Sequence, residues 1–148
     1  QQEIEGADFL DIFAGSGAMG IEALSRGANS ATFIDLSREA FKALESNLQK
    51  LKIAQQATLM FGDYQKMLEK LKSKGAQFDV IFADAPYNMI ETGNELLLAI
   101  KELFLLKSGG LLLIENNQEK LNAPPEGLKW IRSRRSGAAY LHQYRNLL

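Results

Sequence analysis

Short, mostly apolar runs alternate with amphipathic segments over the first 115 residues of this 148-residue chain, and no other feature limits its possible folds as much. Each run has four to six residues, which is the length of a buried strand. The segments between them repeat apolar residues at helical spacing, as Phe41, Leu44 and Leu48 do. This alternation predicts an α/β fold with a mostly parallel sheet covered by helices on both faces. The runs are Phe9–Phe13, Ala31–Ile34, Thr58–Phe61, Phe78–Ala83 and Leu111–Glu115.

The last part of the chain departs from this alternation and predicts a hairpin. Strands near Leu128–Ser133 and Ala139–Arg145 flank a turn at Ser136-Gly137. These two strands complete a sheet of seven, with an antiparallel C-terminal pair, in one domain over residues 1–148. Further expected elements are helices at Ala18–Arg26 and Glu95–Leu106 and a turn at Ser108-Gly109-Gly110.

The composition excludes several kinds of chemistry. The chain has no cysteine, which removes disulfides, thiolate zinc sites, iron–sulfur clusters and cysteine nucleophiles. Its single histidine, His142, removes multi-histidine metal sites. No apolar run approaches the roughly 18 residues that a membrane span needs. We therefore expect a cytoplasmic, monomeric protein that uses no metal and contacts no membrane.

Charge is divided unevenly along the chain, although the net charge is only −1. Residues 120–148 carry six Lys or Arg against one Glu, a net charge of +5, so residues 1–119 carry −6. Arg132, Arg134 and Arg135 can contact nucleic-acid phosphates, or they can protect an exposed strand edge from aggregation. We name them as candidate RNA contacts and leave both interpretations open. We interpret three nearby aromatic residues as sheet packing rather than base-stacking platforms: Trp130, Tyr140 and Tyr144.

A glycine-rich turn follows the first predicted strand and opens a helix. Gly15, Gly17 and Gly20 form the pattern G-x-G-x-x-G, in which backbone can approach a ligand closely and the helix N-terminus adds a positive dipole end. Asp35 ends the second strand, where a carboxylate can accept hydrogen bonds from ribose hydroxyls. A tight turn and a helix cap are the plainer alternatives. The strand–turn–helix context favours a nucleotide-like cofactor.

Two more carboxylates favour S-adenosylmethionine over a nicotinamide dinucleotide as that cofactor. Asp11 lies inside the first strand, where a dinucleotide site normally has apolar residues and a methyl-donor site can use a carboxylate for the methionine ammonium. Asp63 ends the third strand beside Tyr64, where it can accept from the adenine amine or equally cap the next helix. We also assign six further residues to the cofactor site: Phe13, Ala14, Ser16, Leu36, Tyr64 and Asp84.

The fourth strand ends in Asp84-Ala85-Pro86-Tyr87, which suits an exocyclic base amine with two hydrogens to bind and a lone pair to orient. The Asp84 carboxylate and the Ala85 carbonyl can each accept one hydrogen. Pro86 stiffens the turn, and the Tyr87 ring can stack on a base taken out of its helix. A plain β-turn also uses Asp and Pro, but it leaves the other acids at strand ends unexplained. We predict these four residues as catalytic.

These motifs resemble a known family. The run from Asp11 to Ala28, DIFAGSGAMGIEALSRGA, is similar to the glycine motif of bacterial RsmD-type enzymes. Asp84–Tyr87 is similar to the Asp-Pro-Pro-Tyr motif of amine methylation, and the resemblance covers essentially the whole chain. It implies a Rossmann-like class I methyltransferase fold with S-adenosylmethionine as cofactor. It also implies methylation of a guanine N2 amine in 16S ribosomal RNA or in a small-subunit assembly intermediate.

The chain departs from this family at two places. Ala85 stands where the family motif has its first proline, which removes some rigidity from the turn. Only Gln1–Ala7 precede the first predicted strand, so we expect the Arg-rich N-terminal RNA-binding segment of the family to be absent. Both departures keep a catalytically impaired S-adenosylmethionine-binding module as an alternative. DNA adenine-N6 methylation is another, whereas a nicotinamide-dependent dehydrogenase would leave Asp84–Tyr87 unexplained.

Overall fold

The computed structural model describes residues 3–86 and 91–148, and within them seven strands form one sheet. The strands are β1 (Asp8–Ile12), β2 (Ser30–Asp35), β3 (Ala57–Phe61), β4 (Phe78–Asp84), β5 (Leu106–Asn116), β6 (Leu128–Ser136) and β7 (Ala139–Asn146). The helices are α1 (Ala18–Ser25), α2 (Arg38–Lys50), the short 3-10 helix η1 (Ala54–Gln56), α3 (Tyr64–Ser73) and α4 (Thr92–Glu102). None of the helices in these two ranges has both the length and the hydropathy required to cross a membrane.

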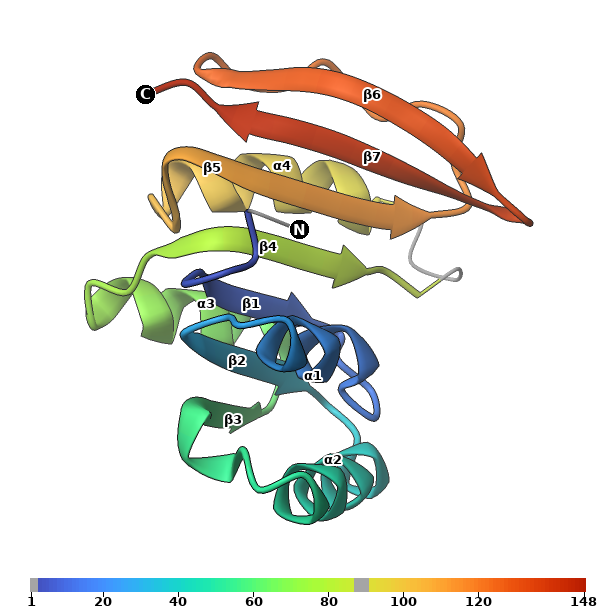
Figure 1. The fold of residues 1–148 in the computed structure, drawn as a ribbon. Helices are drawn as coiled ribbons and strands as arrows, with labels where there is room; N and C mark the ends of the chain where they lie inside the picture. The colour runs from blue at the N-terminus through green and yellow to red at the C-terminus, as the bar shows by residue number, and fades with distance from the viewer. Residues whose placement is uncertain (1–2, 87–90) are drawn as a thin grey trace.

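The sheet has the strand order β3-β2-β1-β4-β5-β7-β6 (Figure 1). The first five strands of the chain pair in parallel, whereas β7 is antiparallel to both β5 and β6. Strand order reverses between β1 and β4, and open α/β sheets bind ligands outside the carboxyl ends of their strands at such a point. The predicted seven-stranded sheet with its antiparallel C-terminal hairpin is confirmed.

Two layers of helices cover the sheet because its central strands are apolar on both faces. In β4, Ile81 packs into one hydrophobic cluster and the next residue, Phe82, packs into the other. The first cluster joins the sheet to α3 and α4, and the second joins it to α1 and α2 (Figure 1). The mostly apolar run Phe78–Ala83 therefore reflects burial on both sides, as predicted.

β5 is longer than predicted and contains a bulge near its start. Its pairing with β4 jumps from Leu106 to Leu111, so residues 107–110 bulge out of the ladder. The expected turn at Ser108-Gly109-Gly110 is this bulge rather than a connection between a helix and a strand. The predicted helix end at Leu106 is wrong, because α4 ends at Glu102 and Leu106 already belongs to the sheet.

Candidate functional site

The carboxyl-terminal ends of four neighbouring strands, β3, β2, β1 and β4, meet at a cavity of about 300 Å³. Two of the residues that line it, Ile34 and Gly62, were not predicted. The only sign of them in the sequence is that each directly precedes a predicted acid. No group of three His, Asp or Glu side chains that could hold a metal occurs in residues 3–86 and 91–148. The strand topology brings together much of the predicted site. The lining residues are Phe13, Ile34, Asp35, Leu36, Gly62, Asp63, Tyr64, Asp84 and Pro86.

Asp35 fastens the glycine turn to the end of β2. Its Oδ2 accepts a hydrogen bond from the Gly15 amide at 2.7 Å, and its Oδ1 accepts one from the Ser37 amide at 2.8 Å. Ser37 caps α2, since its hydroxyl accepts from the Ala40 amide at 3.2 Å. Asp35 therefore organises the loop before α2, and the remaining lone pairs of its carboxylate leave it able to accept from ribose hydroxyls.

Two glycines of the turn are required by the space around them. Gly17 has a φ of +84°, and a Cβ there would lie 2.2 Å from Cδ1 of Leu44. A Cβ on Gly20 would lie 2.3 Å from Cε2 of Phe33. Gly17 immediately precedes α1, whose aligned peptide dipoles place a partial positive charge at the turn.

Asp11 lies beneath this turn and is only 2% exposed. Its Oδ2 accepts a hydrogen bond from the Gly20 amide at 3.0 Å. Burial raises the pKa of this carboxyl to about 7; the bond from Gly20 opposes the shift, and the charges of Asp84 and Asp35 add to it. Asp11 is not among the residues that line the cavity, so its contact with a cofactor ammonium stays a prediction.

Phe13 and Tyr64 form the aromatic wall of the cavity, with ring centroids 5.0 Å apart and planes tilted by 56°. Phe13 has a φ of +62°, a conformation that is strained for any residue except glycine and that is frequent at functional sites. The Tyr64 hydroxyl donates to Oε1 of Glu95 at 2.9 Å, and burial together with this bond raises the pKa of Tyr64. Asp63 both caps α3, by accepting from the Lys66 amide at 3.3 Å, and lines the cavity.

The predicted amine-binding turn begins at the end of β4. Asp84 lines the cavity, and burial raises the pKa of its carboxyl. Ala85 is 1% exposed, and its amide donates to the Glu115 carbonyl at 3.0 Å, which continues the pairing of β4 with β5 by one residue. A proline at this position could not donate that bond. Pro86 also lines the cavity, whereas Tyr87 lies outside the described residues.

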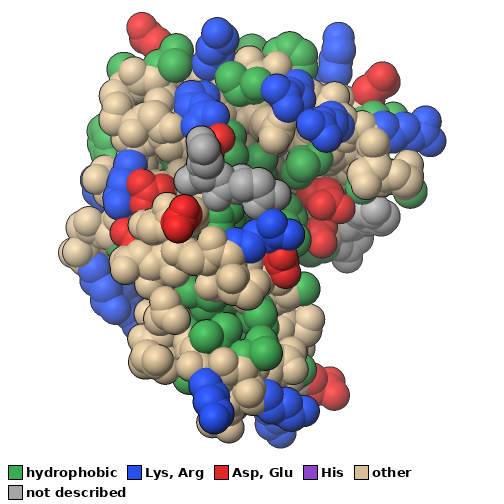
Figure 2. Space-filling model, viewed as in Figure 1, with side chains coloured by type: hydrophobic (Ala, Val, Ile, Leu, Met, Phe, Trp, Pro, Cys, Tyr) green, Lys and Arg blue, Asp and Glu red, His purple; other side chains and the backbone are tan. Residues whose placement is uncertain are grey.

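The C-terminal hairpin separates the three candidate arginines. Side chains alternate between the two faces of a strand, so Arg132 and Arg134 share one face of the sheet and Arg135 lies on the other, paired with Tyr140. All three arginines are exposed. Figure 2 shows Lys and Arg side chains gathered over the hairpin, in the upper part of the view. The basic surface of the hairpin therefore has two sides, which sequence order alone does not distinguish.

The sequence matches the family described as Conserved hypothetical protein 95 over residues 1–145. The chain belongs to this family. One relative, Ribosomal RNA small subunit methyltransferase D of Haemophilus influenzae, is 34% identical over 147 residues, which cover 97% of this chain and 74% of that protein. YlbH of Bacillus subtilis is 35% identical over 115 residues, which cover 78% of this chain and 62% of that protein. The matched regions thus span 62% to 74% of these two relatives.

Solved structures share the fold of this member of the Conserved hypothetical protein 95 family. The yhhF protein of Escherichia coli has a TM-score of 0.84 at 30% identity, covering 97% of this chain and 77% of that chain. HI0767 of Haemophilus influenzae has a TM-score of 0.83 at 32% identity, covering 98% of this chain and 89% of that chain. SMU.776, solved in complex with SAH, has a TM-score of 0.80 at 13% identity and shares the fold alone, over 97% of this chain and 47% of that chain. The Rossmann-like methyltransferase fold is confirmed.

Proposed function

We propose that this chain is an S-adenosylmethionine-dependent methyltransferase that modifies the exocyclic N2 amine of a guanine in small-subunit ribosomal RNA. The observation that carries this proposal is that Asp84, the predicted acceptor for the amine, lines the same cavity as Asp35 and Asp63, the predicted cofactor residues. Family membership and the name of the Haemophilus relative support the RNA substrate. The guanine N2 specificity rests on the resemblance of the turn that begins at Asp84.

The residues of the cavity fit S-adenosylmethionine, which when bound supplies a methyl group already activated on a sulfonium. The rings of Phe13 and Tyr64 provide an apolar wall for a purine, and the Asp63 carboxylate provides an acceptor for its amine. Asp35 holds the Gly15 amide and retains acceptor capacity for ribose hydroxyls. The turn also leaves room beside the backbone, since a Cβ on Gly15 would meet nothing within 4 Å.

The turn at the end of β4 orients the amine that is methylated. The Asp84 carboxylate and the Ala85 carbonyl each accept one amine hydrogen, which directs the nitrogen lone pair at the methyl group. The hydrogen bond from the Ala85 amide to Glu115 anchors the turn to β5 while it does so. Alignment of this kind can remove ~7–11 kcal/mol from the barrier of a bimolecular step.

Asp84 also stabilises the positive charge that forms on the amine nitrogen during the reaction. Methyl transfer forms an N–C bond as the C–S bond breaks, and it leaves a positive charge on the amine nitrogen until one proton departs. The Asp84 carboxylate stabilises that charge and accepts the proton or passes it to water. Because partial burial in the cavity raises the pKa of Asp84 above its ordinary value, this carboxylate is a stronger base than an aspartate with the ordinary pKa.

The test is transfer of labelled methyl from S-adenosylmethionine to unmodified small-subunit ribosomal RNA, presented both naked and within an assembly intermediate. We expect the label as N2-methylguanine. Asp84→Asn keeps the size of the side chain and removes its charge, so it should lower kcat by about 100-fold with little change in cofactor affinity. Glu69→Gln, at an exposed site on α3, is the matched control and should transfer methyl like the wild type.

Other outcomes of this experiment would replace the proposal. Label found in DNA as N6-methyladenine would favour the DNA alternative. Cofactor binding without transfer to any of the substrates would identify an impaired binding module. Equal losses of kcat and cofactor affinity in Asp84→Asn would contradict the role assigned to Asp84 in orienting the amine.

A further inference from the structure

A second and larger cavity lies beside the C-terminal hairpin. It measures about 630 Å³, against about 300 Å³ for the cavity at the strand ends. One wall is the loop between β5 and β6, and the other is one face of the hairpin. Apart from Arg135, none of its residues has a role in the proposed function. The lining residues are Glu119, Lys120, Leu121, Asn122, Ala123, Pro124, Trp130, Ser133, Arg135, Tyr140 and Tyr144.

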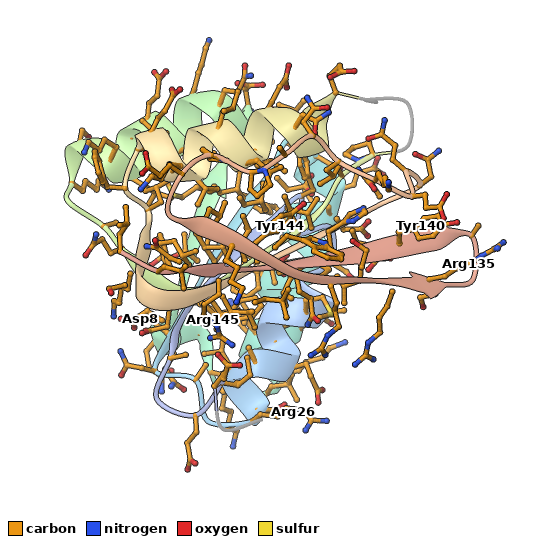
Figure 3. All side chains as sticks on the ribbon, turned by 90° about the horizontal axis from the view of Figure 1, so that it is seen from above. Asp8, Arg26, Arg135, Tyr140, Tyr144 and Arg145 are labelled. Atoms are coloured by element: carbon orange, nitrogen blue, oxygen red, sulfur yellow. The ribbon has the colours of Figure 1, made fainter. Side chains whose placement is uncertain are left out.

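A bulge in β6 builds the aromatic wall of this cavity. Trp130 pairs with Tyr144 and Ser133 pairs with His142, because the register shifts by one residue between the two pairs. In a regular strand, residues three apart face opposite sides of the sheet, and the bulge instead places Trp130 and Ser133 on the same side. Tyr140 lies on that side too, close to the hairpin turn (Figure 3).

Hydrogen bonds hold the Trp130 ring in one orientation although the residue is 51% exposed. Its indole Nε1 donates to Ser133 Oγ at 3.0 Å. The Ser133 hydroxyl then donates to Nδ1 of His142 at 2.8 Å, and His142 Nε2 donates to Oδ1 of Asn116 at 3.0 Å. His142 is fully buried, and this burial lowers its pKa and favours the neutral ring. An aromatic ring that is both fixed and exposed is suited to stack on a ligand.

The prediction that the aromatic residues of the hairpin pack in the sheet therefore holds for Tyr144 and not for Trp130. Tyr144 is 2% exposed and packs in the core, as expected. Trp130 is not buried by the sheet, and its hydrogen bonds orient its ring at the wall of the second cavity.

The second cavity lies at the same end of the sheet as the site of the proposed reaction. Tyr140 pairs across the sheet with Asn116, the last residue of β5. The preceding residue, Glu115, accepts the hydrogen bond from the Ala85 amide in the amine-binding turn. The hairpin turn consequently lies at the same end of the sheet as the carboxyl end of β4, as Figure 1 shows. In the strand order, only β5 lies between β4, which carries Asp84, and β7, which carries Tyr140.

We infer that this cavity binds an unpaired base of the RNA substrate next to the target nucleotide, with the base stacked on Trp130 and its phosphate near Lys120 and Arg135. The inference rests on the proposed function, which supplies the RNA. Unpaired RNA bases are bound by stacking on aromatic side chains, and cations at the rim of such a site neutralise the backbone. A purely apolar ligand would leave the two cations beside the aromatic wall unexplained.

Trp130 is the only tryptophan in the chain, so its fluorescence reports on this cavity alone. We expect a single-stranded oligoribonucleotide to quench the emission as it binds, because a base stacks on the indole. The same oligonucleotide without bases should leave the emission unchanged. Binding of the intact oligonucleotide without quenching would overturn the inference.

Substitutions test whether the second cavity serves the reaction. Trp130→Ala should weaken binding of small-subunit ribosomal RNA by about 10-fold and raise the KM for RNA by a similar factor, at unchanged kcat and cofactor affinity. Trp130→Phe keeps an aromatic surface and should retain most of the affinity. This variant tests the inference independently of the stability of Trp130→Ala. Phe104→Ala is the matched control, since Phe104 is 61% exposed and lines neither of the two cavities discussed above.

The outcomes distinguish this inference from the proposed function. A wild-type protein that methylates RNA, together with an unchanged KM in Trp130→Ala, would overturn the base-binding cavity and leave the proposed function standing. A wild-type protein whose emission is quenched by RNA but that transfers no methyl would contradict the proposed function and support the cavity.

Discussion

The buried carboxyl of Asp11 makes the stability of the protein depend on pH. Burial raises its pKa to about 7 in the folded chain, from the 3.8 of an ordinary aspartate. Between about pH 4 and pH 7 the folded chain keeps a proton that the unfolded chain has released, so this group lowers the free energy of unfolding as the pH rises. Below this window both states are protonated, and above it both are ionised, so its contribution is constant there.

Asp11→Asn tests this dependence because the amide oxygen can still accept the hydrogen bond from Gly20. We expect the difference in the free energy of unfolding between variant and wild type to grow in favour of the variant from about pH 4 to pH 7 and then to level off. Denaturant titrations at several pH values measure it. A difference that stays constant over this window would show that Asp11 ionises normally.

Ala85 shows what the sequence predicts about a single residue and what it does not. The alanine predicts a turn that is less rigid than one with proline, because proline fixes φ. It does not predict the hydrogen bond from the Ala85 amide to the Glu115 carbonyl, since that bond depends on how β4 pairs with β5. The bond anchors the turn by a contact that proline cannot make, and so offsets part of the rigidity that the missing proline removes.

At the scale of elements, Tyr64 connects α3 to α4 across the edge of the first cavity. Its hydroxyl donates to Glu95 in the first turn of α4 at 2.9 Å, while its ring contacts Phe13. Tyr64→Phe removes the hydrogen bond and keeps the ring, so it should lower the free energy of unfolding by about 1 kcal/mol in denaturant titrations. Glu95→Gln keeps an acceptor at the same place and should lose less. Equal stability of Tyr64→Phe and the wild type would show that this bond contributes nothing.

Elements buried on both faces were predictable, and those whose register depends on a neighbour were not. The run Phe78–Ala83 predicts β4 because only a central strand needs apolar residues on both sides. The acids of the first cavity follow such runs directly, so their meeting at one edge was also predictable. Ser108-Gly109-Gly110 marks the irregularity at residues 107–110, but that it lies inside a strand follows only from the pairing with β4. No local pattern predicts the bulge after Trp130, which comes from the pairing with β7. The second cavity depends on the bulge after Trp130, so sequence reasoning assigned this tryptophan to packing.

At the scale of the whole molecule, the charge polarity of the sequence becomes a polarity in space. Arg145 forms an ion pair with Glu3, at the opposite end of the hairpin from Arg135 (Figure 3). Arg135 lies next to the hairpin turn, on the side of the sheet where β5 ends. Only part of the net charge of +5 over residues 120–148 is therefore placed to meet RNA at the two cavities.

The salt dependence of RNA binding measures which of these charges touch phosphate. Arg135→Ala should reduce the slope of log Kd against log salt concentration by about 0.7, because one phosphate contact to a single strand is lost. Lys129→Ala removes the same charge from the same hairpin, at an exposed site that pairs in register with Arg145. Arg135 pairs with Tyr140, so the two sites lie five residues apart along β7, roughly 17 Å. This separation exceeds the Debye length of about 10 Å at 0.1 M salt. We therefore expect Lys129→Ala to leave the slope unchanged, and equal changes in both variants would mean that net charge rather than a contact at Arg135 governs binding.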